Sequence, residues 1–193
     1  MAKVYFISET YFKNNTPVNM NVEPQLINIA IMDAQVLHIQ IALGSKLYKK
    51  LEDLISGNTI GLPANAKYKS LLDDLVRPAV VQWSLVESLA YIRYKIMNKT
   101  VGGQSSDNTT PIDLEELKYL AAQLKNKAEF YTQRIVDYLC ANSSDYPEYT
   151  SGNGVDDILP ETNAYFGGMQ LDDTIDLYTR FLGLNSHTVD IKT

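Results

Sequence analysis

The stretch Ile39-Gln-Ile-Ala-Leu-Gly-Ser-Lys-Leu-Tyr-Lys-Lys-Leu51 decides the fold of this chain, because it reads as two helices joined by one sharp turn. Apolar residues up to Leu43 recur at helical spacing, and Gly44 is the residue type that most readily ends a helix. Ser45 suits the N-cap of a second helix, whose apolar residues again follow three- and four-residue steps. The stretch therefore predicts a corner between two packed helices.

The helix before this corner is predicted to begin near Pro24 and to be apolar over most of its circumference. Residues at helical spacing form its main face, namely Ile27, Ala30, Ala34, Leu37 and Ile41. A helix of this kind is either buried at the centre of a bundle or pressed between subunits. Asp33 interrupts its apolar surface, and we expect Arg77 or Arg93 to pair with this carboxylate.

Two longer helices are predicted to follow and to pack against each other in opposite directions. The first spans about 66–98 and should kink or break at Pro78, whose ring removes one backbone donor. The second spans about 111–138 and carries an unbroken apolar stripe. The Gly-containing segment 100–110 is expected as a flexible tip between them. The fold class is therefore all-α, a helical bundle with a long antiparallel helix hairpin.

Three regions are predicted along the chain. Residues 1–22 form an extended N-terminal arm, with strand character at 4–7, and residues 23–142 form the helical domain. Residues 143–193 form a C-terminal tail, because turn residues dominate its start and its apolar residues occur in short islands. Either the tail grips a partner or it folds back on its own bundle, and the sequence leaves both open.

Composition is that of a globular protein and disfavours nucleic acid as a partner. The chain of 193 residues is long enough for one domain, and its net charge of −6 disfavours an electrostatic grip on phosphates. Ser8 and Glu9 interrupt the first apolar residues, so no signal peptide is expected, and no apolar run approaches the length of a membrane helix. The lone Cys140 allows no internal disulfide. We expect a soluble protein made inside a cell.

Residues that usually carry catalysis or metal binding form no recognisable site in the sequence. The acidic clusters at 156–157 and 172–176 lack the alternating oxygen ligands and central glycine of a calcium loop. His38 and His187 are too few for a His-rich zinc site. Cys140 lies on a regular helix, which is typical of a buried, inert thiol. We predict no enzymatic activity, no cofactor and no metal.

One enzymatic pattern stays open as an alternative. Arg180 and His187 have six residues between them, which resembles the Arg-x4-6-His motif of the helical HEPN ribonucleases, where the pair supports RNA cleavage. Gly183 and Asn185 should break the helix between them, and Phe181 stands where a polar residue is usual. A generic helical protein-binding module is a second alternative.

An ordered set of helix-packing motifs runs through residues 23–140. The set consists of Ile31-x-x-Ala34, then Ile39-x-x-x-Leu43-Gly44-x-x-Leu47-Tyr48-x-x-Leu51, then Tyr68-x-x-Leu71-Leu72 and Pro78. It resembles the head–tail connector (adaptor) proteins of tailed bacteriophages. Within that family it is most similar to the ring proteins of crAss-like phages. The shorter members of the family lack the long tail that begins at Asn142.

The resemblance implies a structural protein of the virion neck, assembled in the host cytoplasm, with no catalytic residues. Its subunits would form a homo-oligomeric ring, twelve-fold in the family, that docks on the portal protein and extends the DNA channel. Further neck or tail proteins would bind the ring, while genomic DNA passes through without specific binding and no membrane takes part. Within this interpretation, acidic residues such as Asp73 and Asp74, or the tail carboxylates, are expected to face the channel and keep DNA mobile.

Aromatic residues of the arm and the tail are the predicted interface anchors, because aromatic side chains dominate interface energetics. The chain has 13 tyrosines, a residue equally suited to protein interfaces and to a wet helical core. The predicted anchors are Tyr165, Phe166, Tyr178, Phe181 and Tyr149 in the tail, with Tyr5 and Phe6 in the arm.

Overall fold

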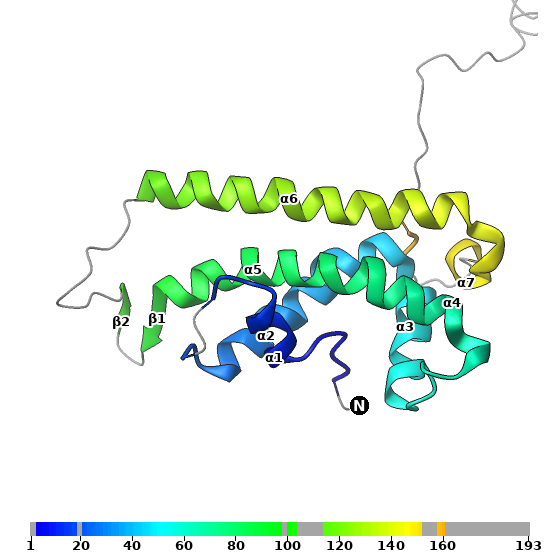
Figure 1. Ribbon diagram of the computed structural model, residues 1–193. Coiled ribbons are helices and arrows are strands. Elements are labelled where there is room, and N and C mark those ends of the chain that lie inside the picture. The colour runs from blue at the N-terminus through cyan, green and yellow to red at the C-terminus, as the bar shows by residue number, and fades with distance from the viewer. Residues whose placement is uncertain (1–2, 19–20, 98–99, 104–113, 152–157, 161–193) are drawn as a thin grey trace, which may run out of the picture. The chain divides into compact units, whose positions relative to one another are not determined.

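A computed structural model of the chain describes residues 3–18, 21–97, 100–103, 114–151 and 158–160 (Figure 1). The helical elements are α1 (Glu9–Asn14), α2 (Pro24–Ala34), η1 (Gln35–Ile39), α3 (Gln40–Ser56), η2 (Pro63–Asn65), α4 (Ala66–Leu71), η3 (Leu72–Val76), α5 (Arg77–Arg93), α6 (Leu114–Ala141), η4 (Ser143–Asp145) and α7 (Pro147–Thr150). Two four-residue strands, β1 (Tyr94–Met97) and β2 (Thr100–Gly103), pair antiparallel. The predicted all-α class is confirmed.

The predicted corner at Gly44 is present. Gly44 has φ 73° and ψ 156°, a conformation open essentially to glycine alone, and it interrupts helical geometry inside α3. Ser45 uses its polar atoms differently from the predicted N-cap. Its N–H donates to the Ile158 carbonyl at 3.0 Å, and its Oγ accepts from the Ile158 N–H at 3.0 Å. The corner is therefore also an attachment point for a segment more than a hundred residues later.

The helix hairpin is formed by α5 and α6, which run side by side in opposite directions (Figure 1). Buried Ala128, Ile135 and Leu139 lie on the predicted stripe of α6. The helix before the tip is shorter than predicted. It ends at Arg93, where the β1–β2 hairpin begins, and residue types such as Thr100 and Val101 favour strand over helix.

Two π-helical segments, η1 and η3, were not predicted from the sequence. Each adds one residue to a turn, so every position after it rotates relative to an ideal α-helix. Segment η3 lies just before Pro78, where a kink or break was expected. Across η1, the buried apolar residue that follows Ala34 is Ile39, which is five residues later instead of the three or four of an α-helix. Leu37 and Ile41, which were predicted on the main apolar face, consequently point outward.

The N-terminal segment is part of the core rather than an extended arm. It contains α1, and its apolar residues Phe6, Ile7 and Phe12 are buried. Fully buried Gln35 holds the segment, since its Oε1 accepts from the Phe6 N–H at 2.9 Å and its Nε2 donates to the Val4 carbonyl at 3.1 Å. The segment is thereby held through its main chain.

The start of the predicted tail also belongs to the helical body. Residues 143–150 form η4 and α7, and both Tyr146 and Tyr149 are buried against the core. The Tyr146 hydroxyl donates to the Lys67 carbonyl at 3.1 Å. For residues 143–150 and 158–160, the alternative that the chain folds back on its own bundle is therefore the right one.

The helical run Pro24–Ser56 is long and apolar enough, by length and composition alone, to cross a membrane, contrary to the expectation that no apolar run approaches that length. In the structure Gly44 breaks this run, and α2 packs closely against α5. Its buried apolar residues, among them Ile27, Ile31 and Ile39, belong to the bundle core. Burial in the bundle accounts for part of its apolar composition, since 44% of the apolar window is buried.

Candidate functional site

The predicted interface anchors differ in how exposed they are in the structure. Phe6 is 1% exposed and Tyr149 is 4% exposed, so neither ring is available to a partner. Both rings fill the core of their own chain, which is the reason that their prediction as anchors is wrong. Tyr5 is 36% exposed and remains available. The other four anchors, Tyr165, Phe166, Tyr178 and Phe181, lie outside the described residues.

An exposed row of aliphatic side chains follows α2, η1 and the start of α3. We call it the apolar row; it consists of Ile29, Val36, Leu37 and Ile41, with exposed fractions of 42%, 44%, 52% and 39%. Solvated aliphatic residues that lie close together mark surfaces that bind other molecules. In the sequence, this surface was indicated by a helix that is apolar over most of its circumference. That pattern left two alternatives open, burial in the bundle and contact between subunits.

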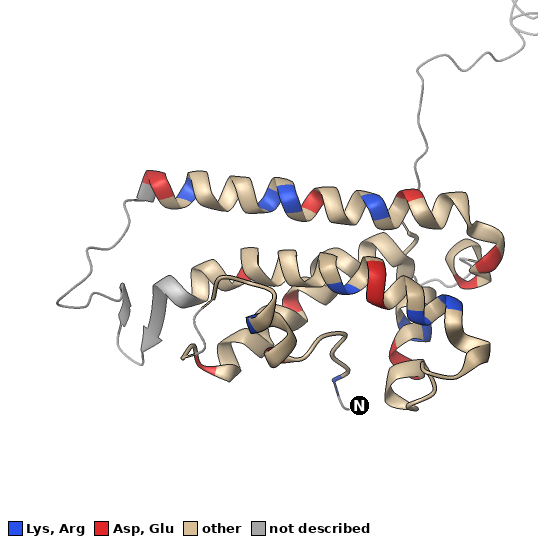
Figure 2. Ribbon diagram, viewed as in Figure 1, with Lys and Arg blue, Asp and Glu red and all other residues tan. Residues whose placement is uncertain are grey.

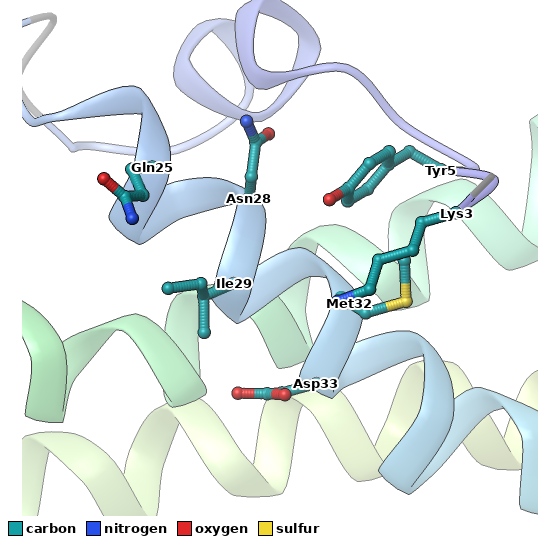
Figure 3. Close-up of a pocket in the computed structure, with 7 residues that line it drawn as sticks. All are labelled: Lys3, Tyr5, Gln25, Asn28, Ile29, Met32 and Asp33. Atoms are coloured by element: carbon teal, nitrogen blue, oxygen red, sulfur yellow. The ribbon is translucent and has the colours of Figure 1, made fainter.

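One hollow lies between the N-terminal segment and α2, with a volume of about 520 Å³. Figure 3 shows Lys3 and Tyr5 on the N-terminal segment and the remaining lining residues on α2. The lining residues are Lys3, Tyr5, Gln25, Asn28, Ile29, Met32 and Asp33. Ile29, at one end of the apolar row, therefore lies in this hollow beside polar side chains.

Asp33 in this hollow accepts a hydrogen bond from a tyrosine. Its Oδ2 accepts from the Tyr91 hydroxyl at 2.8 Å, and this hydrogen bond is the main reason that the pKa of Tyr91 is raised. Arg77 is occupied elsewhere, since its Nε donates to the Phe6 carbonyl at 3.0 Å and its Nη1 binds Asp73. The predicted pairing of Asp33 with Arg77 is therefore wrong, and the side chain of the other candidate, Arg93, lies outside the described part of the structure.

A second hollow, which we call the indole hollow, has a volume of about 380 Å³ between η1, α3, α5 and α6. Its lining residues are Leu37, His38, Ile41, Trp83, Glu129, Thr132 and Gln133. The His38 ring stacks on the Trp83 indole, with centroids 3.5 Å apart and planes 7° from parallel. Two members of the apolar row, Leu37 and Ile41, form part of its wall.

Hydrogen bonds hold the floor of the indole hollow in place. His38 Nε2 lies 2.9 Å from Glu87 Oε1, and Trp83 Nε1 donates to Thr132 Oγ1 at 2.7 Å. The Thr132 hydroxyl in turn donates to the Ala128 carbonyl at 3.2 Å. The hollow is thus preformed and has an aromatic floor, and preformed sites lose little conformational entropy when they bind.

Helix α6 of the hairpin also exposes large apolar side chains. None of residues 115–127 is buried, and Tyr119 and Phe130 are 69% and 61% exposed. Figure 2 shows lysines and arginines spread along this helix between acidic residues. The helix therefore offers partners both apolar contacts and charge.

A tyrosine cluster joins α4 to the segment after α6. The Tyr68 hydroxyl donates to both Glu148 oxygens, at 3.1 and 2.9 Å. Burial, followed by this hydrogen bond, raises the pKa of Tyr68 to about 12. Burial also raises the pKa of Tyr146, whose ring meets that of Tyr68 edge to face. With raised pKa values, both tyrosines stay neutral at neutral pH, and the cluster holds α4 against the segment after α6.

Within the described ranges, no group of three or more His, Cys, Asp or Glu side chains is placed to hold a metal ion. Cys140 is half-buried, with its Sγ 3.7 Å from the Tyr149 hydroxyl. Asp73 forms ion pairs with Lys69 and Arg77 along its own helix. Arg180 and His187, the pair of the ribonuclease alternative, lie outside the described residues, as do the acidic clusters at 156–157 and 172–176.

Residues 39–157 match DUF6712, which is described as a family of unknown function. The chain belongs to this family. The match covers the corner at Gly44, the helix hairpin and α7, and it begins after α2. No curated protein matches the chain. No solved structure matches it either.

Proposed function

We propose that this DUF6712 protein is a subunit of a head–tail connector ring in a tailed bacteriophage. The ring would dock on the portal protein, extend the DNA channel and bind further neck or tail proteins. The ordered motifs from Ile31 to Pro78 support the proposal by their resemblance to connector proteins. The observation that carries it is the large exposed apolar surface of a small subunit, on the apolar row and again on α6.

A ring requires each subunit to use two different surfaces, one for each neighbour. The apolar row and α6 are two such surfaces on separate elements. Tyrosine and phenylalanine on α6 are residue types enriched at protein interfaces. In the ring, Asp74 and other exposed acids would line the channel and repel DNA, so that the genome slides without binding.

Native mass spectrometry and negative-stain microscopy test the proposal directly. The full chain is measured alone and together with the portal protein encoded in the same genome. We expect closed rings, formed either by the chain alone or on the portal. A protein that stays monomeric and does not bind the portal would refute the connector function, and RNA cleavage that His187→Ala abolishes would favour the ribonuclease instead.

A further inference from the structure

Helix α6 has two sides with opposite character, separated by its buried face. At 3.6 residues per turn, successive residues rotate by about 100°. Relative to the buried line through Ala128 and Ile135, Glu129 and Gln133 fall on one side, where they line the indole hollow. Lys127 falls on the other side. The hollow and the opposite side of α6 are therefore two separate surfaces of one subunit.

The side of α6 away from the hollow carries a row that we call the α6 stripe. Its members are Leu120, Lys127, Tyr131, Arg134 and Tyr138, spaced so that they share one helix face. Leu120 and Tyr138 are 40% and 37% exposed, and Arg134 lies 5.9 Å from the centre of the Tyr131 ring. The stripe thus combines apolar and aromatic surface with two positive charges and no acidic residue.

The indole hollow has the complementary character. Among the described residues that line it, the charged one is Glu129, and Glu87 lies beside it in contact with His38. Lys125 approaches Glu129 at 3.6 Å, but both side chains are more than half exposed, so this pair is weak and easily replaced. Two carboxylates, Glu129 and Glu87, beside an apolar wall and an aromatic floor suit a cationic, aromatic helix face.

We infer that the occupant of the indole hollow is a second copy of this chain, which docks its α6 stripe there. The inference rests on the proposed ring function and names the surfaces that would join neighbouring subunits. Lys127 and Arg134 of one copy would approach Glu129 and Glu87 of the next. Tyr131, which is partly buried against its own core, would present only its exposed edge to Leu37 and Ile41. Because the two surfaces lie on opposite sides of α6, the contact is head-to-tail and repeats from copy to copy.

The size of this contact predicts how the subunits assemble. From Leu120 to Tyr138 the stripe is about 27 Å long and one helix, about 10 Å, wide. It buries less than the roughly 800 Å² per partner of a typical stable interface. Pairs should therefore be weak on their own, and closure of the ring or binding to the portal should add the missing stability.

Cross-linking of single-cysteine variants tests the contact in the full chain. In a Cys140→Ser background, Lys127→Cys marks the stripe and Gln133→Cys marks the rim of the hollow. We expect a short bismaleimide to join the two variants, when they are mixed, far more efficiently than either variant alone. Asp53→Cys, on the exposed part of α3, is the matched control and should join with Lys127→Cys only at background level.

A charge reversal adds an independent measurement. Lys127→Glu with Arg134→Glu should weaken self-association on the order of tenfold, whereas Lys49→Glu with Lys50→Glu, on α3, should leave it unchanged. Efficient joining of either single variant to itself would show a two-fold symmetric contact and overturn the inference. Rings that form without the mixed cross-link would overturn it too, while leaving the connector function in place. Mixed cross-links without any ring would support the contact and refute the connector.

Discussion

Replacing Gln35 with leucine should loosen the N-terminal segment from the helical body. Gln35 is 0% exposed, and its amide is the partner of the Phe6 N–H, the Val4 carbonyl and the Tyr48 hydroxyl. Leucine has a similar volume but no polar atom, so the buried Phe6 N–H loses its partner at a cost of about 1–3 kcal/mol. The other two groups lie nearer to water or can rotate, and add about 1 kcal/mol together.

The expected loss is therefore about 2–4 kcal/mol, a large share of the roughly 5–15 kcal/mol that stabilises a typical domain. Urea unfolding measures the free energy, and amide hydrogen exchange at Phe6 measures the local release of the segment. Gln123→Leu, on the exposed face of α6, is the control and should change stability by less than about 0.5 kcal/mol. An unchanged urea midpoint together with unchanged exchange at Phe6 would refute the role of Gln35.

Three further predictions concern other parts of the bundle. Gly44→Ala should destabilise the fold by about 1–3 kcal/mol in thermal unfolding, because φ is 73° and the new Cβ would lie 2.8 Å from the Pro160 Cδ; Gly61→Ala, with open space around it, is the control. Stability should fall as the pH rises from about 10 to about 12, because Tyr68 holds its proton more tightly when folded, and Tyr68→Phe should reduce this fall in urea titrations at several pH values. Thr132→Val should cost about 1 kcal/mol in urea unfolding, because the Trp83 Nε1–H loses its acceptor, and an unchanged midpoint would show that the bond contributes nothing.

Local signals in the sequence were enough to predict the corner and the hairpin. A glycine that ends a helix and an apolar stripe in steps of three and four are both local patterns. Each can therefore be recognised from a few neighbouring residues without the rest of the chain. The fold class follows from the same signals, since nearly every segment between 24 and 141 has helical periodicity.

Features that depend on distant partners could not be predicted in this way. Phe6 is buried because Gln35, twenty-nine residues away, satisfies its backbone, and Tyr149 is buried because residues 143–150 find a place beside α3. A tyrosine looks the same in sequence whether it fills a core or faces a partner. The outward turn of Leu37 and Ile41 follows from one extra residue in a π-helical turn, which the sequence marks with no glycine or proline.

The floor of the indole hollow has a practical consequence for the study of assembly. Trp83 is the only tryptophan in the chain, so all indole emission of the protein comes from this one site. Trp83 is only 6% exposed and stacks on His38, so a side chain that enters the hollow would change the indole emission by contact with this pair rather than by removing water from around the ring. A change of indole emission during oligomer formation would therefore report, in unmodified protein, a contact at this one site.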